Sequence, residues 1–266
     1  MQVRRTFSAS RAWRPTVGAG LTRTLGVVIH MPSRPSLQRL IAKTKFFGDM
    51  NPRLAALERL HVIVEQQLDQ ARITEIARVR DEHSSADASL HPDDREFDLM
   101  VLEQQVTHLL PKLMRGGLLL TTWSTFERSV KDIAHRTAKH VGRPLSDNYF
   151  RKKSFVAATD ATLSSCAGIV AFPDAGAKAR LELLASVRNT LVHHDGRLDE
   201  APENIPSHDP YALAGLGLQV ERDYSFEYLV PTEVFLKDSI DLVYQQTHDL
   251  ASRVFDALFP PDANDA

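Results

Sequence analysis

Four polar side chains gather at the end of one amphipathic stretch, LLASVRNTLVHHDG, residues 183–196: Arg188, Asn189, His193 and His194. A guanidinium can hold phosphate oxygens, an amide can orient a neighbouring group, and an imidazole with a pKa of about 6.5 can transfer a proton. Asn189 and His193 are four residues apart, so a helix presents both on one face, away from its apolar side. The group therefore predicts a site for an anionic phosphodiester.

Arg188 is unusual because it lies in the apolar stripe of its own helix. At about 100° per residue, it is roughly 40° from Leu184 and inside the arc of apolar side chains. Glu127 has a matching place in the stretch 118–139, roughly 40° from Trp123. Because an unpaired buried charge is costly, we expect Arg188 and Glu127 to form an ion pair. Such a pair is also compatible with a purely structural role that fixes the register of two helices.

The other residues that could do chemistry are isolated. Cys166 is the single cysteine, which excludes an internal disulfide and a cysteine-based zinc site, and its apolar neighbours indicate an inert buried thiol. His135 and His140 lack a third ligand at metal-binding spacing, so we expect no metal and no cofactor. The basic run RKKS, residues 151–154, is typical of a solvated face, with an RNA contact as the alternative.

The elements that position these residues are mostly helices. Helical spacing of apolar residues covers 52–83, 95–114, 118–139, most of 146–172, 175–193 and 232–259. Arg115–Gly117 predicts a break or kink, and alternation near 214–230 predicts a β-hairpin turning at Arg222–Asp223. We therefore expect one all-α domain over 52–259: a bundle of five or six helices with a small β-hairpin before the C-terminal helix.

The first 48 residues differ from the rest in charge. They contain nine Lys or Arg and no acidic residue, whereas residues 49–266 contain 23 Lys or Arg against 34 Asp or Glu, a net −11. This segment fits a transit-like presequence, a basic nucleic-acid-binding arm, or upstream sequence included by an early start codon. We favour the last interpretation because Met31 and Met50 offer later starts, and we expect residues 1–48 to be disordered.

The segment RNTLVH, Arg188 to His193, resembles the R-x4-6-H motif of the HEPN (higher eukaryotes and prokaryotes nucleotide-binding) superfamily. The spacing alone is common, since Arg78 and His83 repeat it. The segment at Arg188 differs by its adjacent Asn189, by two apolar residues before His193 and by a following glycine. A helix carrying STFERS, the motif helix, a loop, a hairpin and a last helix follow in an order similar to that of family members.

The resemblance implies a metal-independent endoribonuclease of toxin–antitoxin, abortive-infection or other defence systems. In this family the motifs of two protomers meet at a dimer interface, and the ribose 2′-OH attacks to leave a 2′,3′-cyclic phosphate. Arg188 and His193 would be catalytic, with Asn189 assisting and Glu127 and His194 supporting. R-x5-H is also a family spacing, which makes His194 the alternative to His193.

The implied partners are RNA, a second copy of the chain, and an antitoxin or another regulatory protein. Members paired with a nucleotidyltransferase often carry Tyr where this chain has Asp195, which argues against that mode of silencing. No apolar run approaches the roughly 18 residues of a membrane span, so we expect no membrane partner and a cytoplasmic location. The alternative function is a non-catalytic HEPN-like interaction or nucleotide-binding module.

Overall fold

The structure is a computed structural model of the chain. It describes residues 50–85, 92–143, 145, 150, 154–198, 210–223 and 226–260, together with Arg39, Ile41, Lys43, Thr44, Phe46 and Gly48. Most of the predicted N-terminal extension, and residues 151–153 of the basic run, lie outside these residues. Regular structure in the described residues is helical apart from one two-stranded antiparallel hairpin.

The order of elements confirms the predicted fold class. The helices are α2 (Met50–Ser85), α3 (Pro92–Gln104), the π-helix η1 (Gln105–Leu109), α4 (Leu110–His140), α5 (Phe155–Ala167), α6 (Ala175–His193), α7 (Pro210–Gly215) and α8 (Glu233–Leu258). Strands β1 (Leu218–Asp223) and β2 (Phe226–Pro231) lie directly before α8. Since α3, η1 and α4 follow one another without a break, the described residues form six helices and one hairpin.

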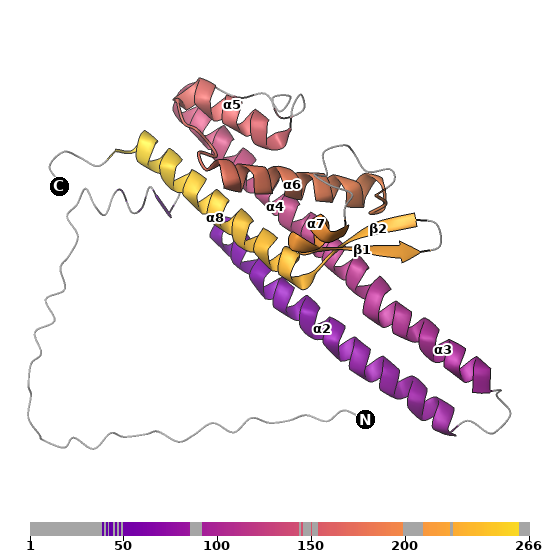
Figure 1. Ribbon diagram of the computed structural model, residues 1–266. Coiled ribbons are helices and arrows are strands. Elements are labelled where there is room, and N and C mark those ends of the chain that lie inside the picture. Colours follow the sequence, from indigo (N-terminus) through magenta and orange to yellow (C-terminus); the bar gives the residue numbers. More distant parts are fainter. Residues whose placement is uncertain are drawn as a thin grey trace, which may run out of the picture.

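Helix α4 is the centre of the bundle. Figure 1 shows α2 antiparallel to the continuous α3–η1–α4 rod, with the far ends of both projecting beyond the other helices. Helix α8 packs along α4 and α2, and α5 and α6 also pack against α4 (Figure 1). The buried face of α4 repeats every three or four residues, through Leu119, Trp123, Phe126, Val130 and Ile133. This helix therefore positions α5 and α6 relative to each other.

A break or kink was predicted at Arg115–Gly117, and the break is wrong, because α4 runs through these residues. Arg115 is held by Glu65 of α2, with Nε–Oε1 and Nη2–Oε2 distances of 2.9 and 2.6 Å. Two glycines inside a helix cost only about 1 kcal/mol each, which packing against α2 offsets. The irregular turn lies instead at Gln105–Leu109, where the helix widens into one π-helical turn.

Two further boundaries differ from the expected ones. Over 146–172 the described helix covers only Phe155–Ala167, because Ser154 caps its start and Gly168, with φ +68°, ends it. The hairpin pairs Asp223 with Phe226, so it turns two residues later than expected.

The described residues before 52 also contact the bundle. Arg39 forms a 2.7 Å ion pair with Asp256, and the ring of Phe46 packs edge-on against Phe255 and Phe259 of the C-terminal region. Phe46 is buried in the core cluster. Packing therefore reaches further toward the N-terminus than the predicted domain boundary.

Candidate functional site

Helix α6, which carries the motif, is fixed at its start by a side-chain cap. Asp174 Oδ1 accepts hydrogen bonds from the backbone N–H groups of Gly176 and Ala177, at 2.8 and 3.2 Å. An Asp at this position satisfies N–H groups that have no partner inside the helix. Leu181 and Leu184 then bury one face of α6 in the core. The predicted start of the motif helix after Asp174 is confirmed.

The end of α6 is tied to the β-hairpin. The carbonyl oxygen of Thr190 accepts hydrogen bonds from His194 N and Gly196 N, at 3.1 and 3.0 Å. Asp195 and Gly196 both have left-handed backbone angles, φ +51° and +81°, which reverse the chain. Gly196 O then accepts from Leu229 N of β2 at 2.8 Å. The glycine that follows the motif thus ends the helix and also attaches it to a strand.

Two motif residues, Asn189 and His193, lie on the outer side of α6, and Arg188 contacts Asn189 from the margin of the apolar face. Asn189 and His193 are exposed, as their shared face predicts, and Arg188 is half-buried. Arg188 Nη1 donates a 2.8 Å hydrogen bond to Asn189 Oδ1, which orients the guanidinium. His194 is half-buried and caps the helix end. Within the described part of the chain, the imidazole of His193 has no hydrogen-bond partner.

The prediction of an ion pair between Arg188 and Glu127 is wrong, because each side chain has a different partner. Glu127 Oε1 accepts a 2.8 Å hydrogen bond from the indole N–H of Trp123, and its Oε2 lies 3.9 Å from Lys131 Nζ. The Glu127 side chain is 30% exposed. Val192, beside Arg188 in the same arc of α6, is 43% exposed. Both charges sit at the margin of an apolar face, where water solvates them and no partner is required.

A cavity of about 740 Å³ lies between α4, α5 and α6, and Asn189 lines it. Its walls come from three directions: Trp123, Glu127 and Lys131 of α4, Phe150, Ser154, Phe155 and Val156 at α5, and Ala179, Glu182, Leu183, Ala185, Ser186 and Asn189 of α6. The hydrogen bond from Arg188 to Asn189 therefore joins the motif to the edge of this cavity.

The cavity combines aromatic rings with acidic groups. Lys131 Nζ lies 5.4 Å from the ring centroid of Phe155 and 5.8 Å from that of Phe150. Glu127 and Glu182 place two carboxylates on its walls against this one ammonium. The lining thus has an excess of negative charge and of hydrogen-bond acceptors.

Most of the residues that line this cavity were not predicted from the sequence as site residues. Trp123, Glu127 and Lys131 recur every four residues, which puts all three on one face of α4. That spacing could have predicted Lys131 as a neighbour of Trp123 and Glu127. Nothing in the sequence near Phe155 or Glu182 indicates that their helices meet the same face of α4.

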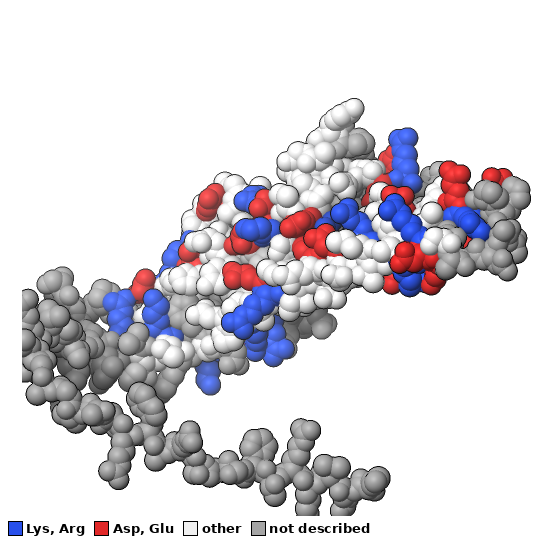
Figure 2. Space-filling view, turned by 90° about the horizontal axis from the view of Figure 1, so that it is seen from below, with Lys and Arg blue, Asp and Glu red and all other residues white. Residues whose placement is uncertain are grey.

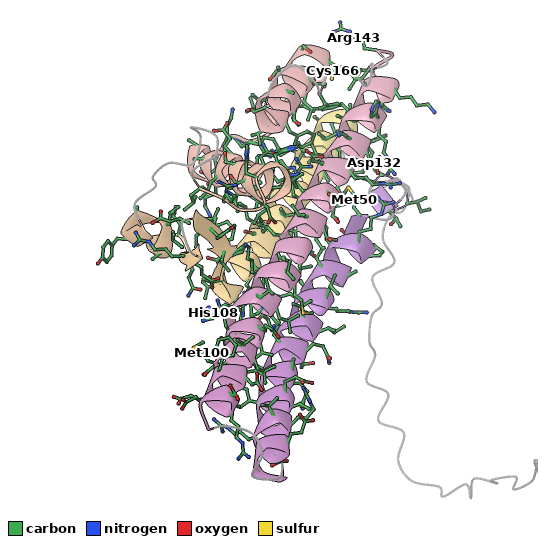
Figure 3. All side chains as sticks on the ribbon, turned by 90° about the vertical axis from the view of Figure 1, so that its right-hand side faces the viewer. Met50, Met100, His108, Asp132, Arg143 and Cys166 are labelled. Carbon is green, nitrogen blue, oxygen red and sulfur yellow. The ribbon has the colours of Figure 1, made fainter. Side chains whose placement is uncertain are left out.

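Cys166 lies apart from the motif. Figure 3 shows it near Arg143, at the end of the molecule opposite Met100. Burial raises the pKa of the Cys166 thiol above its ordinary value. Among the described residues, no three His, Cys, Asp or Glu side chains are grouped as a metal ion would need. None of the helices in this part of the chain has the length and apolar character needed to cross a membrane.

Comparisons of the chain with protein-family models, with curated proteins and with solved structures found no match. The resemblance to the HEPN superfamily therefore rests on the motif residues and on the order of the elements, and it stays a prediction.

Proposed function

We propose that this protein is a metal-independent endoribonuclease of the toxin or defence type, acting as a homodimer through Arg188, Asn189 and His193. One observation carries the proposal: Arg188 donates a hydrogen bond to Asn189, and Asn189 shares the outer face of α6 with the exposed His193. A guanidinium and an accessible imidazole on the same helix suit a phosphodiester, whose cleavage needs both charge stabilisation and proton transfer. The order of elements, which resembles that of the HEPN superfamily, supports the same function.

The proposed reaction uses two histidines. His193 of one protomer removes the proton from a ribose 2′-OH, and the 2′-oxygen attacks the adjacent phosphorus. The bond to the 5′-oxygen of the next nucleotide breaks, and the second His193 donates a proton to that oxygen. The products are a 2′,3′-cyclic phosphate and a 5′-hydroxyl. Arg188 stabilises the negative charge on the phosphate oxygens as it develops.

A second copy supplies what one chain lacks. Each chain offers one exposed motif imidazole, whereas the reaction needs a general base and a general acid. A twofold contact brings the same patch of both chains together, so one motif provides two histidines and two arginines.

The net charge of −11 over residues 49–266 favours a selective nuclease over one that binds any RNA. Figure 2 shows basic and acidic side chains interspersed on one face of the molecule, without a continuous basic track. Non-specific RNA binding depends on such tracks. We place the enzyme in the cytoplasm, with an antitoxin or another regulatory protein that restrains it. Asp195 leaves no tyrosine for modification at that position of the motif.

The test compares RNA after expression of matched variants. Total RNA from cells expressing the wild type should show discrete fragments, while His193→Ala should leave the RNA intact. His248→Ala, which removes an exposed histidine from α8, is the control and should cleave like the wild type. Purified protein should keep cutting in EDTA, and fragments should end in a 2′,3′-cyclic phosphate. Intact RNA with the wild type would refute the proposal.

Mixed dimers test the composite site. Co-expression of His193→Ala chains with the wild type should lower activity more than the dilution of active chains predicts, because a mixed dimer has one imidazole instead of two. A monomer that cuts RNA at the full rate would refute the shared site.

The second candidate is a non-catalytic interaction or nucleotide-binding module. It is favoured by the lack of a hydrogen-bond partner for His193 in the described part of one chain, because catalytic imidazoles are usually oriented by a neighbour. Nucleotide binding without RNA cleavage would favour this candidate.

A further inference from the structure

The wall that α6 gives to the cavity between α4, α5 and α6 includes three small side chains beside Glu182, Leu183 and Asn189. Ala179, Ala185 and Ser186 of α6 line the cavity together with the aromatic rings of Trp123 and Phe155. Small residues opposite large aromatic ones leave a volume that the protein itself does not fill. At about 740 Å³, the space falls within the range of small-molecule sites.

Aromatic rings give this cavity a surface for a planar group. The ammonium of Lys131 is near the rings of both Phe150 and Phe155, as a cation lies over an aromatic face. Lys131 is 41% exposed at its side chain, so it can move aside into water at little cost. The rings it leaves can then stack against a nucleobase, as aromatic side chains do in single-stranded RNA recognition.

The carboxylates determine which edge of the base fits. Glu127 is held in place by the indole N–H of Trp123, which binds its Oε1 at 2.8 Å. A carboxylate accepts hydrogen bonds and donates none at neutral pH. Guanine presents two adjacent donors, N1–H and N2–H₂, whereas adenine, cytosine and uracil each set an acceptor beside their donor.

The two carboxylates repel a phosphate group from the cavity, whereas Arg188 offers it a cation beside the cavity. Asn189 lines the cavity and accepts from Arg188 Nη1 at 2.8 Å. A nucleotide whose base enters the cavity can therefore set its phosphate near the guanidinium, which favours anions.

We propose that the cavity binds a guanine base, with Glu127 accepting hydrogen bonds from its N1–H and N2–H₂ and with the phosphate directed toward Arg188. This site rests on the proposed ribonuclease for its biological use: it would place cleavage next to guanosine. Binding of the base itself does not depend on catalysis.

Fluorescence of Trp123 reports directly on the cavity. The chain has two tryptophans, Trp13 and Trp123, so a Trp13→Phe background assigns the signal to the cavity wall. Guanosine 5′-monophosphate should change the fluorescence saturably, with a Kd at least tenfold lower than those of the adenosine, cytidine and uridine monophosphates. Equal affinity for all four nucleotides, or no saturable change, would overturn the proposal.

Glu127→Gln is the deciding variant. Its amide oxygen can still accept from the indole of Trp123, but its NH₂ group opposes the donors of guanine. The Kd for guanosine monophosphate should rise tenfold or more, with an unchanged circular dichroism spectrum. Glu75→Gln, which makes the same change in an exposed Glu–Arg pair of α2, should leave the Kd unchanged. An unchanged Kd in Glu127→Gln would overturn the role of Glu127.

Two measurements separate this site from the proposed activity. His193→Ala should bind guanosine monophosphate like the wild type, because its imidazole lies outside the cavity lining. Sequencing of fragment ends should show guanosine beside the cut. Guanine binding without RNA cleavage would support the cavity site and refute the nuclease. Cleavage without any preference for guanosine, and without nucleotide binding, would support the nuclease and refute the cavity site.

Discussion

Replacing Gly196 with Ala tests whether the end of the motif helix depends on its attachment to β2. Gly196 has φ +81°, and an added Cβ would lie 3.3 Å from Leu229 O and 3.5 Å from Leu191 Cδ2. The left-handed backbone costs Ala about 1 kcal/mol. Crowding against a backbone carbonyl, which cannot rotate away as a side chain can, adds about 1–2 kcal/mol. We expect the free energy of unfolding to fall by about 2–3 kcal/mol in total.

Urea unfolding followed by circular dichroism measures this loss, and the melting temperature should fall by roughly 5–10 °C. Gly142→Ala is the matched control. Gly142 has φ +72°, but nothing lies within 4 Å of an added Cβ, so this variant isolates the backbone cost of about 1 kcal/mol. Equal losses in the two variants would refute the idea that the approach of Gly196 to Leu229 holds the helix end.

Three further predictions concern charges and the thiol. Glu127→Ala should lower the free energy of unfolding by only about 1 kcal/mol, the value of the hydrogen bond from Trp123, and a loss of three times as much in urea unfolding would restore the case for a buried ion pair. Asp160→Ala should cost about 2–3 kcal/mol, because Asp160 binds Lys178 Nζ and two backbone N–H groups after α5, and a calorimetric melt unchanged from the wild type would contradict this. Cys166 should react with a thiol-specific disulfide reagent more slowly in the native protein than in the unfolded chain at pH 8, because burial raises its pKa. As the pH rises, the Cys166 thiol ionises in the unfolded chain before it ionises in the native protein. The stability contributed by the neutral thiol is therefore complete below the ordinary pKa of 9.0 and is lost as the pH rises above it. Equal reaction rates in the two states would exclude a raised pKa in the native protein.

The local features of the motif helix could be predicted from the sequence. Asp174 caps its start, a glycine ends it, and Asn189 and His193 share an outer face, because helix periodicity and capping depend only on nearby residues. The hairpin before α8 was predictable from alternation along its strands, which is also a local pattern, with an error of two residues in its turn.

Packing between helices decided the remaining features of the site. A helical wheel gives the direction of Glu127 from its own axis, but the depth of the side chain depends on how closely α6 approaches α4. Its carboxylate therefore pairs locally with Trp123 and Lys131, and Arg188 pairs with its neighbour Asn189. Long-range packing is a sum over many weak contacts between distant segments, and no local pattern records it.

The cavity depends on packing between helices more than any other feature of the site. Its rings and carboxylates are ordinary members of their own helices in the sequence: Trp123 and Glu127 belong to α4, Phe155 to α5 and Glu182 to α6. They share a space because α5 and α6 both pack on α4 while small side chains of α6 leave that space unfilled. The sequence by itself determined where the helices and the motif lie. Tertiary structure alone decided which side chains the motif meets, because that depends on the distance between helix axes.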